Sequence, residues 1–214
     1  FRGVAIAMHE SSNGFNVTIL PGANTKKMHS SRRDAFEATN ATPLALVDVI
    51  KQSVTDEGFC NPEGKFKILP FNETIKVGVC KIHPNLYASQ ILAFKGFKGI
   101  IIEGTGLGHA PITKVDKHTG ENEKIAKAIK KLCKDGTVVA MTTNTVYGRT
   151  DLNVYSTGRD LQTYGVIGNY CSMNTDVAFI KLAWLLSNFT ADETKELYHE
   201  NLRGELPLRE GIDE

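Results

Sequence analysis

The alternation of strand-like and helix-like patterns between residues 75 and 142 constrains the fold of this chain most. Apolar runs predict three strands, over residues 75–82, 99–103 and 137–142. Apolar positions at helical spacing predict two intervening helices, over residues 84–96 and 121–134, with a glycine at or just after each end. The run Gly-Ile-Ile-Ile-Glu at 99–103 is typical of a strand covered on both faces. This order predicts a small parallel sheet with right-handed crossovers.

The chain before residue 75 has a less regular pattern. Strands are predicted over residues 1–9 and 15–20, joined by a connection that contains an Asn-Gly turn signal, and a short helix is predicted over 44–50. We therefore expect an α/β protein with three parts. Residues 1–50 form the end of an α/β domain, residues 51–74 form a linker, and residues 75–214 form a second, carboxyl-terminal α/β domain.

The carboxyl-terminal part of the sequence is predicted to be helical. An apolar stripe over residues 174–187 predicts one helix, and the capping box from Thr190 to Glu193 predicts the start of a short final helix. The segment 177–186 contains Lys181 and is too short to span a bilayer, so we expect no membrane association.

The sequence begins at Phe1, which leads directly into an apolar strand, Val4 to Met8. A domain rarely starts on an uncovered core strand, so we expect the chain to be the downstream part of something longer. A bare apolar strand edge is also a pairing surface, so we do not expect a monomer.

Composition excludes several classes of protein. Hydrophobic residues make up 41% and charged residues 23%, which argues against disorder. The formal net charge is +1, so an RNA partner would need a local basic patch or a second polypeptide. The four cysteines are widely scattered, at Cys60, Cys80, Cys133 and Cys171, and lack the spacing of a zinc or redox motif. We therefore expect reduced thiols, no metal and an intracellular protein.

The basic stretch from Lys27 to Phe36 is the first candidate site. Ser31 and Asp34 have the spacing of a capping box, which predicts a helix start directly after the basic residues. Lys27 would then lie on the loop that enters this helix, where a cation can face a site. The alternative is a solvated surface charge, which is the common fate of a lysine.

Two glycine-containing segments are further candidates. Gly104, Thr105 and Gly106 follow the predicted strand 99–103, but the spacing is not that of a dinucleotide-binding loop, which argues against a nicotinamide or flavin site. The segment is either a tight turn or part of a ligand site at the carboxyl edge of the sheet. His109 is tempting as an acid–base residue, but a hydrogen-bonded structural histidine is the better interpretation.

The second segment, residues 147–160, is a long polar stretch with two glycines and many hydrogen-bond donors. We expect a loop that either binds ligand or builds a subunit interface. The interface is favoured, with Tyr155, Ser156 and Arg159 as contact residues, because tyrosine and arginine dominate such surfaces.

Four blocks of sequence together resemble one family. They are Lys-Met-His-Ser-Ser-Arg-Arg-Asp-Ala-Phe at 27–36, Ile-Glu-Gly-Thr-Gly-Leu-Gly-His at 102–109, Tyr-Gly-Arg-Thr-Asp-Leu-Asn-Val-Tyr-Ser-Thr-Gly-Arg-Asp at 147–160, and Asn-Leu-Arg-Gly-Glu at 201–205. The chain resembles the carboxyl-terminal part of the bacterial-type L-asparaginase fold. The first block favours the archaeal glutamyl-tRNA(Gln) amidotransferase branch of that superfamily.

The resemblance implies a fold and a chemistry. Residues 1–50 would be the last strands of an asparaginase-like amino-terminal domain. The family's nucleophile is a threonine, assisted by a second threonine, an aspartate and a lysine. The lysine falls at Lys27, whereas neither threonine motif occurs in this sequence and both would lie upstream. The expected reaction is hydrolysis of a side-chain amide through an acyl-enzyme.

The resemblance also implies partners. Ammonia from glutamine would pass to a tRNA-binding partner that holds ATP, magnesium and most of the tRNA(Gln) and converts Glu-tRNA(Gln) to Gln-tRNA(Gln). This chain would bind no cofactor, would form a homodimer and would act in the cytoplasm. Two alternatives remain open, a free L-asparaginase and a non-catalytic fragment that serves dimerisation and docking.

Overall fold

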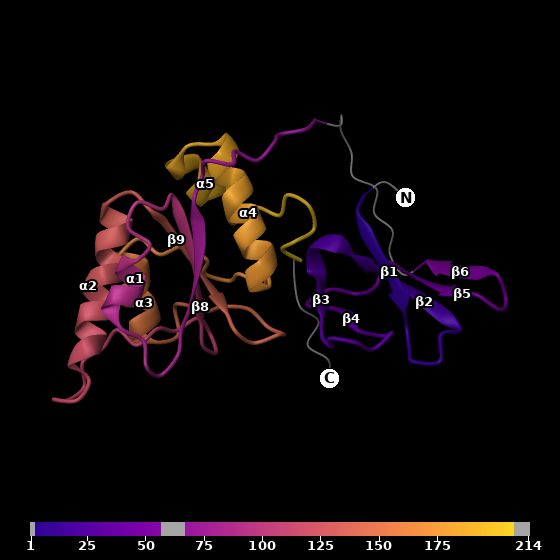
Figure 1. Cartoon of the computed structure of the whole chain (residues 1–214), viewed down its shortest axis with the longest axis horizontal. Coiled ribbons are helices and arrows are strands. Elements are labelled where there is room, and N and C mark those ends of the chain that lie inside the picture. The colour runs from indigo at the N-terminus through magenta and orange to yellow at the C-terminus, as the bar shows by residue number, and fades with distance from the viewer. Residues whose placement is uncertain (1–2, 57–66, 208–214) are drawn as a thin grey trace. The chain divides into compact units, whose positions relative to one another are not determined.

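The computed structural model describes residues 3–56 and 67–207, which belong to two compact units. One unit comprises Phe1–Ile68 with Asn201–Glu214, and the other comprises Leu69–Glu200. Figure 1 labels the helices and strands of both units. The predicted domain limits stay a prediction, because Phe1 and residues 57–66 of the expected linker lie outside the described residues.

The first unit is built from antiparallel strands. Its larger sheet has the order β1-β2-β5-β6. The members are β1 (Ala5–His9), β2 (Asn16–Pro21), β5 (Ala45–Asp48) and β6 (Ser53–Asp56). A short 3₁₀ helix, η1 (Gly22–Asn24), leads into the hairpin of β3 (Thr25–Lys27) and β4 (Phe36–Ala38). The two strands predicted over 1–9 and 15–20 are confirmed as the pair β1 and β2.

The helix predicted at Ser31 is wrong, because this segment is the turn of the β3–β4 hairpin. The backbone N–H groups of Ser31 and Arg32 donate to Nδ1 of His29, at 3.1 and 3.2 Å. The Arg32 guanidinium binds the Asp34 carboxylate and lowers the pKa of that carboxyl group. Serine, arginine and aspartate are therefore used to close a turn rather than to cap a helix.

The helix predicted over 44–50 is also wrong, because residues 45–48 form β5 and pair with both β2 and β6. Asp48 Oδ1 accepts hydrogen bonds from the backbone N–H groups of Ile50 and Lys51, at 3.0 and 2.9 Å, and so fixes the β5–β6 turn. The strand β6 occupies the beginning of the segment expected to be a linker.

The second unit confirms the predicted parallel sheet. Its strands β7 (Val77–Lys81), β8 (Gly99–Gly104) and β9 (Val138–Thr143) are parallel and lie in the order β7-β8-β9. The helices are α1 (Ala88–Leu92), α2 (Gly120–Lys134), α3 (Ser156–Thr163), α4 (Thr175–Asn188) and α5 (Ala191–Leu197). Sequence patterns predict all of these elements except α3, which begins inside the segment 147–160 that was expected to be loop throughout.

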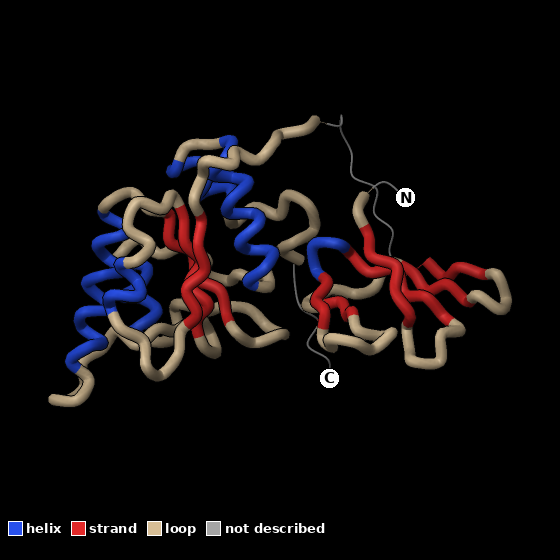
Figure 2. The backbone as a smooth tube through the Cα atoms, in the orientation of Figure 1, coloured by secondary structure: helices blue, strands red, loops and turns tan. Residues whose placement is uncertain are grey.

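Helices cover both faces of this sheet (Figure 2). A Cβ built on Gly78 would lie 2.3 Å from the Phe94 ring beyond α1, whereas one built on Gly99 would lie 2.6 Å from Leu186 on α4. Strand residues of the Gly78 face, among them Ile100 and Ile102, form the main core with α1, α2 and α3. Ile100 and Ile102 are fully buried, as expected for a central parallel strand.

Three other expectations concern the chain as a whole. No helix in the described part of the chain is long and apolar enough to cross a membrane. Cys80, Cys133 and Cys171 are free thiols, and Cys60 lies outside the described residues. Among the described residues, no group of three histidine, cysteine or acidic side chains is placed to hold a metal ion.

Candidate functional site

The glycine-rich segment after β8 forms a tight turn at the carboxyl edge of the parallel sheet. Thr105 and His109 exchange two backbone hydrogen bonds, of 3.1 and 3.0 Å. A Cβ on Gly104 would lie 2.9 Å from the His109 backbone, so this glycine is required by close packing. Gly106 has φ +52° and a Cβ there would meet nothing within 4 Å, so its backbone conformation, not a lack of space, favours glycine. Thr105 and Gly106 are both exposed at this edge.

The end of β9 joins this turn. The Thr143 hydroxyl donates to the Gly106 carbonyl at 2.5 Å, and the backbone N–H of Asn144 donates to the Gly104 carbonyl at 2.9 Å. The Thr145 hydroxyl lies 3.0 Å from that of Thr143. The carboxyl ends of β8 and β9 therefore form one hydrogen-bonded edge, the usual position of ligand sites in open α/β sheets.

The loop that follows β9 packs against the same turn and leads into α3. The backbone N–H of Asp151 donates to the Leu107 carbonyl at 2.9 Å, and Leu152 is fully buried in the core. The Arg159 guanidinium donates to the carbonyls of Asn153 and Val154, at 2.7 and 3.1 Å. Arg159 thus holds its own loop in shape, a role that the sequence did not indicate.

His109 connects the turn to α3. Its Nδ1 lies 3.2 Å from the Thr157 hydroxyl, and its ring meets the Tyr155 ring edge-on with centroids 5.1 Å apart. Its Nε2 is buried and has no hydrogen-bond partner among the described residues. Burial lowers the pKa of His109, which favours the neutral imidazole at neutral pH. The histidine is hydrogen-bonded, as the sequence led us to expect.

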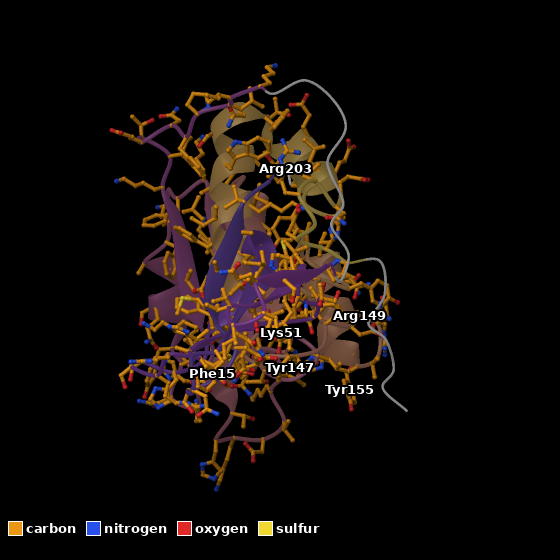
Figure 3. All side chains as sticks on the ribbon, turned by 90° about the vertical axis from the view of Figure 1, so that its right-hand side faces the viewer. Phe15, Lys51, Tyr147, Arg149, Tyr155 and Arg203 are labelled. Atoms are coloured by element: carbon orange, nitrogen blue, oxygen red, sulfur yellow. The ribbon has the colours of Figure 1, made fainter. Side chains whose placement is uncertain are left out.

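Aromatic and basic side chains surround this edge. Tyr147, Tyr155 and Tyr170 are 55%, 56% and 48% exposed. The Arg149 guanidinium lies 5.1 Å from the Tyr170 ring centroid, and the Tyr170 hydroxyl accepts a 2.9 Å hydrogen bond from Asn153. The side chains of Tyr147, Arg149 and Tyr155 are labelled in Figure 3. Exposed tyrosines with arginine are typical of surfaces that anchor a partner.

Lys27 belongs to the other unit, where it is the last residue of β3. Its Nζ lies 5.5 Å from the ring centroid of Phe36, its cross-strand partner on β4. The side chain is exposed, and within the described part of the chain its ammonium group forms no hydrogen bond or ion pair. Lys27 therefore stands on a hairpin rather than on a loop ahead of a helix, with its charge available.

A cavity of about 290 Å³ lies beside this hairpin within the first unit, and Phe36 is part of its wall. Its polar lining includes His9, Glu10, Asp34 and Glu37. Nδ1 of His9 is buried and has no hydrogen-bond partner among the described residues. Phe36 thus lines the cavity and also lies next to the Lys27 ammonium.

A family model matches part of each of the two units. Residues 1–57 match the family described as Asparaginase, N-terminal, and residues 76–197 match the Glutaminase/Asparaginase C-terminal domain. The chain therefore belongs to the glutaminase/asparaginase family.

Within that family the chain is similar to archaeal proteins named as the D component of glutamyl-tRNA(Gln) amidotransferase. The protein of Methanococcus maripaludis strain S2 is 40% identical over 213 residues, which cover 96% of this chain and 48% of that protein. The protein of Thermofilum pendens is 33% identical over 218 residues, which cover 100% of this chain and 46% of that protein. The chain thus spans about half the length of these relatives.

Solved structures confirm the asparaginase-like α/β fold. The thermostable L-asparaginase from Thermococcus kodakarensis superposes with a TM-score of 0.79 at 24% identity, covering 96% of this chain and 58% of that one. L-asparaginase I from Vibrio cholerae superposes with a TM-score of 0.70 at 25% identity, covering 89% of this chain and 55% of that one.

Proposed function

We propose that this chain is part of the glutaminase component of a tRNA-dependent amidotransferase, which releases ammonia from glutamine to convert Glu-tRNA(Gln) to Gln-tRNA(Gln). The observation that carries the proposal is 40% identity to the D component of an archaeal glutamyl-tRNA(Gln) amidotransferase over 96% of the chain, including the basic block at 27–36. The chain spans about half the length of that relative, so the activity of the whole protein is part of what we propose.

The proposed reaction is acyl transfer by a threonine that lies outside this chain. Its hydroxyl oxygen attacks the side-chain amide carbon of glutamine, ammonia leaves, and water then hydrolyses the ester to glutamate. Lys27 assists by stabilising the deprotonated threonine through a lysine–aspartate relay. The exposed ammonium of Lys27, without an ion pair in the described residues and fixed on a two-stranded hairpin, supports this role.

The partners follow from the same proposal. Ammonia passes to a partner that binds ATP, magnesium and most of the tRNA, and the complex acts in the cytoplasm. One edge of the sheet forms a homodimer contact or binds substrate. It comprises Gly104, Thr105, Gly106, Tyr155 and Ser156. Exposed Tyr147 and Tyr155 favour the contact, since tyrosines commonly anchor protein interfaces.

A free L-asparaginase is the second candidate, favoured by the superposition on two L-asparaginases. Ammonia release by the full-length protein from glutamine and from asparagine, each with and without Glu-tRNA(Gln) and the tRNA-binding partner, separates the candidates. We expect release from glutamine that rises when charged tRNA and partner are present, with uncharged tRNA as control. Rapid release from asparagine that is indifferent to tRNA would establish the free asparaginase instead. If ammonia is released from neither amide, the remaining candidate is a non-catalytic role in dimerisation and docking.

A further inference from the structure

Lysine side chains gather on the outer surface of α2 and on the loop before it. Residues 113–135 contain seven lysines and four acidic residues. Six side chains of α2 are exposed, and five of them are lysines, namely Lys124, Lys127, Lys130, Lys131 and Lys134. The helix lies on the opposite side of the sheet from α4 (Figure 1). We refer to this surface as the α2 lysine stripe.

The stripe is straight and narrow. With 3.6 residues per turn, Lys124, Lys127, Lys131 and Lys134 fall within an arc of about 80° on the helix. Ten residues separate the first from the last, which corresponds to about 15 Å along the axis. A nucleic-acid duplex carries one negative charge per about 1.7 Å, so the stripe can face several phosphates at once.

Ion pairs on the helix leave these lysines available. Lys124, Lys127 and Lys131 pair with Glu121, Glu123 and Asp135, at 3.0, 2.7 and 2.9 Å. The three lysine side chains remain 69%, 72% and 54% exposed. Exposed pairs of this kind are weak and screened by salt, so a phosphate can replace the carboxylate. Lys134 has no ion pair within the described part of the chain.

The opposite face of the sheet carries the opposite charge. Residues 175–200, which contain α4 and α5, include two lysines and five acidic residues. The net charge of +1 for the whole chain therefore conceals a positive helix layer and a negative one. A polyanion would be attracted to the α2 side and repelled from the α4 side, which gives binding a defined orientation.

We propose that the α2 lysine stripe binds the phosphate backbone of structured RNA. An acidic protein fits less well, because protein interfaces rely on buried aromatic and apolar anchors and the exposed residues of α2 are lysines and one glutamate. Phosphate contacts need only positive charge and hydrogen-bond donors. The choice of tRNA as the RNA rests on the proposed function, whereas binding itself is measured without any enzymatic step.

The test compares two triple variants with the same change in net charge. The stripe variant carries K127Q, K131Q and K134Q. The control carries K76Q, K81Q and K195Q in the same unit, and Lys81 and Lys195 pair with Glu103 and Asp192. Each triple therefore removes two ion-paired lysines and one lysine without an ion pair in the described residues.

Fluorescence anisotropy with labelled, unfractionated tRNA measures affinity between about 50 and 200 mM salt. We expect the stripe variant to bind tRNA at least tenfold more weakly. The slope of log K against log salt concentration should become shallower by about 2–3, since each lost phosphate contact removes about 0.9 from that slope. The control should stay within twofold of the parent protein. Equal losses in both variants, or none in either, would overturn the proposal.

Two further measurements separate this proposal from its alternatives. Poly-glutamate should bind more weakly than tRNA, and equal or tighter binding would overturn the choice of RNA in favour of an acidic protein. Ammonia release from glutamine without tRNA, measured with the full-length protein, should be unchanged in both triple variants. A protein that binds tRNA through the stripe but releases no ammonia would overturn the proposed function and leave the RNA site standing.

Discussion

Substitution of Gly158 by alanine should displace α3 from the loop against which it packs, which contains Leu152. Gly158 is buried in the first turn of α3, and a Cβ there would lie 2.5 Å from the Leu152 carbonyl oxygen and 2.8 Å from the Leu152 Cα. Ordinary contact requires about 3.5 Å, so the helix or the loop must move by about 1 Å. The neighbouring atoms are backbone, so no side-chain rotation can relieve the contact.

The expected loss of stability follows from two opposing terms. Overpacking of a well-packed site costs about 1–3 kcal/mol. Alanine gains about 1 kcal/mol over glycine in a helix. We expect G158A to lower the free energy of unfolding by about 1–2 kcal/mol, because a rigid backbone contact belongs at the upper end of the overpacking range.

Gly120→Ala is the matched control, since Gly120 also lies in the first turn of a helix and its Cβ would meet nothing within 4 Å. Urea unfolding followed by the fluorescence of Trp184, the one tryptophan of this sequence, reports on the unit that contains both glycines. G120A should leave stability unchanged or raise it. A G158A protein as stable as G120A would refute the close packing of α3 on the loop.

Two other predictions concern the same unit. Thr190→Ala should cost about 1 kcal/mol in urea unfolding, because it removes the hydroxyl of a capping box. In this box the Glu193 carboxylate accepts from the Thr190 backbone N–H at 2.9 Å and from the Thr190 hydroxyl at 2.7 Å, and an unchanged unfolding midpoint would contradict the cap. Burial lowers the pKa of His109, so the unfolded chain binds more protons below the ordinary pKa of about 6.5 and stability should rise with pH through that range. H109N should therefore flatten the dependence of stability on pH between about 5 and 7, whereas an unchanged slope would contradict the burial of the imidazole.

Local periodicity was sufficient to predict most of the second unit. The apolar run at 99–103 and the apolar face of α2 each lie within a single element, so the sequence pattern and the structure agree. The helix α3 was missed because its start, Ser-Thr-Gly-Arg-Asp, has weak helix propensity and a buried glycine. Packing of Leu161 into the core, rather than propensity, explains its formation.

The first unit was harder to predict because short polar motifs have more than one structural use. Ser31 and Asp34 have capping-box spacing, but His29 and Arg32 supply closer partners and produce a turn. The strand β5 has only four residues, and pairing with β2 and β6 determines its conformation. Sequence likewise identified the turn at 104–109 and the segment at 147–160, but the contact of His109 with Thr157 spans 48 positions and required the structure.

The most direct test of the proposed function compares Lys27→Met with Lys26→Met in the full-length protein. Both residues lie on β3, but Lys27 pairs with Phe36 and Lys26 with Glu37, so their side chains leave opposite faces of the hairpin. The measurement is kcat for ammonia release from glutamine, with unfolding curves to show that both variants fold. We expect K27M to lose about 10²–10⁴-fold, as groups in proton relays do, and K26M to stay near the parent rate. Near-parent turnover of K27M, or an equal loss in K26M, would contradict the assignment of Lys27 to the catalytic set.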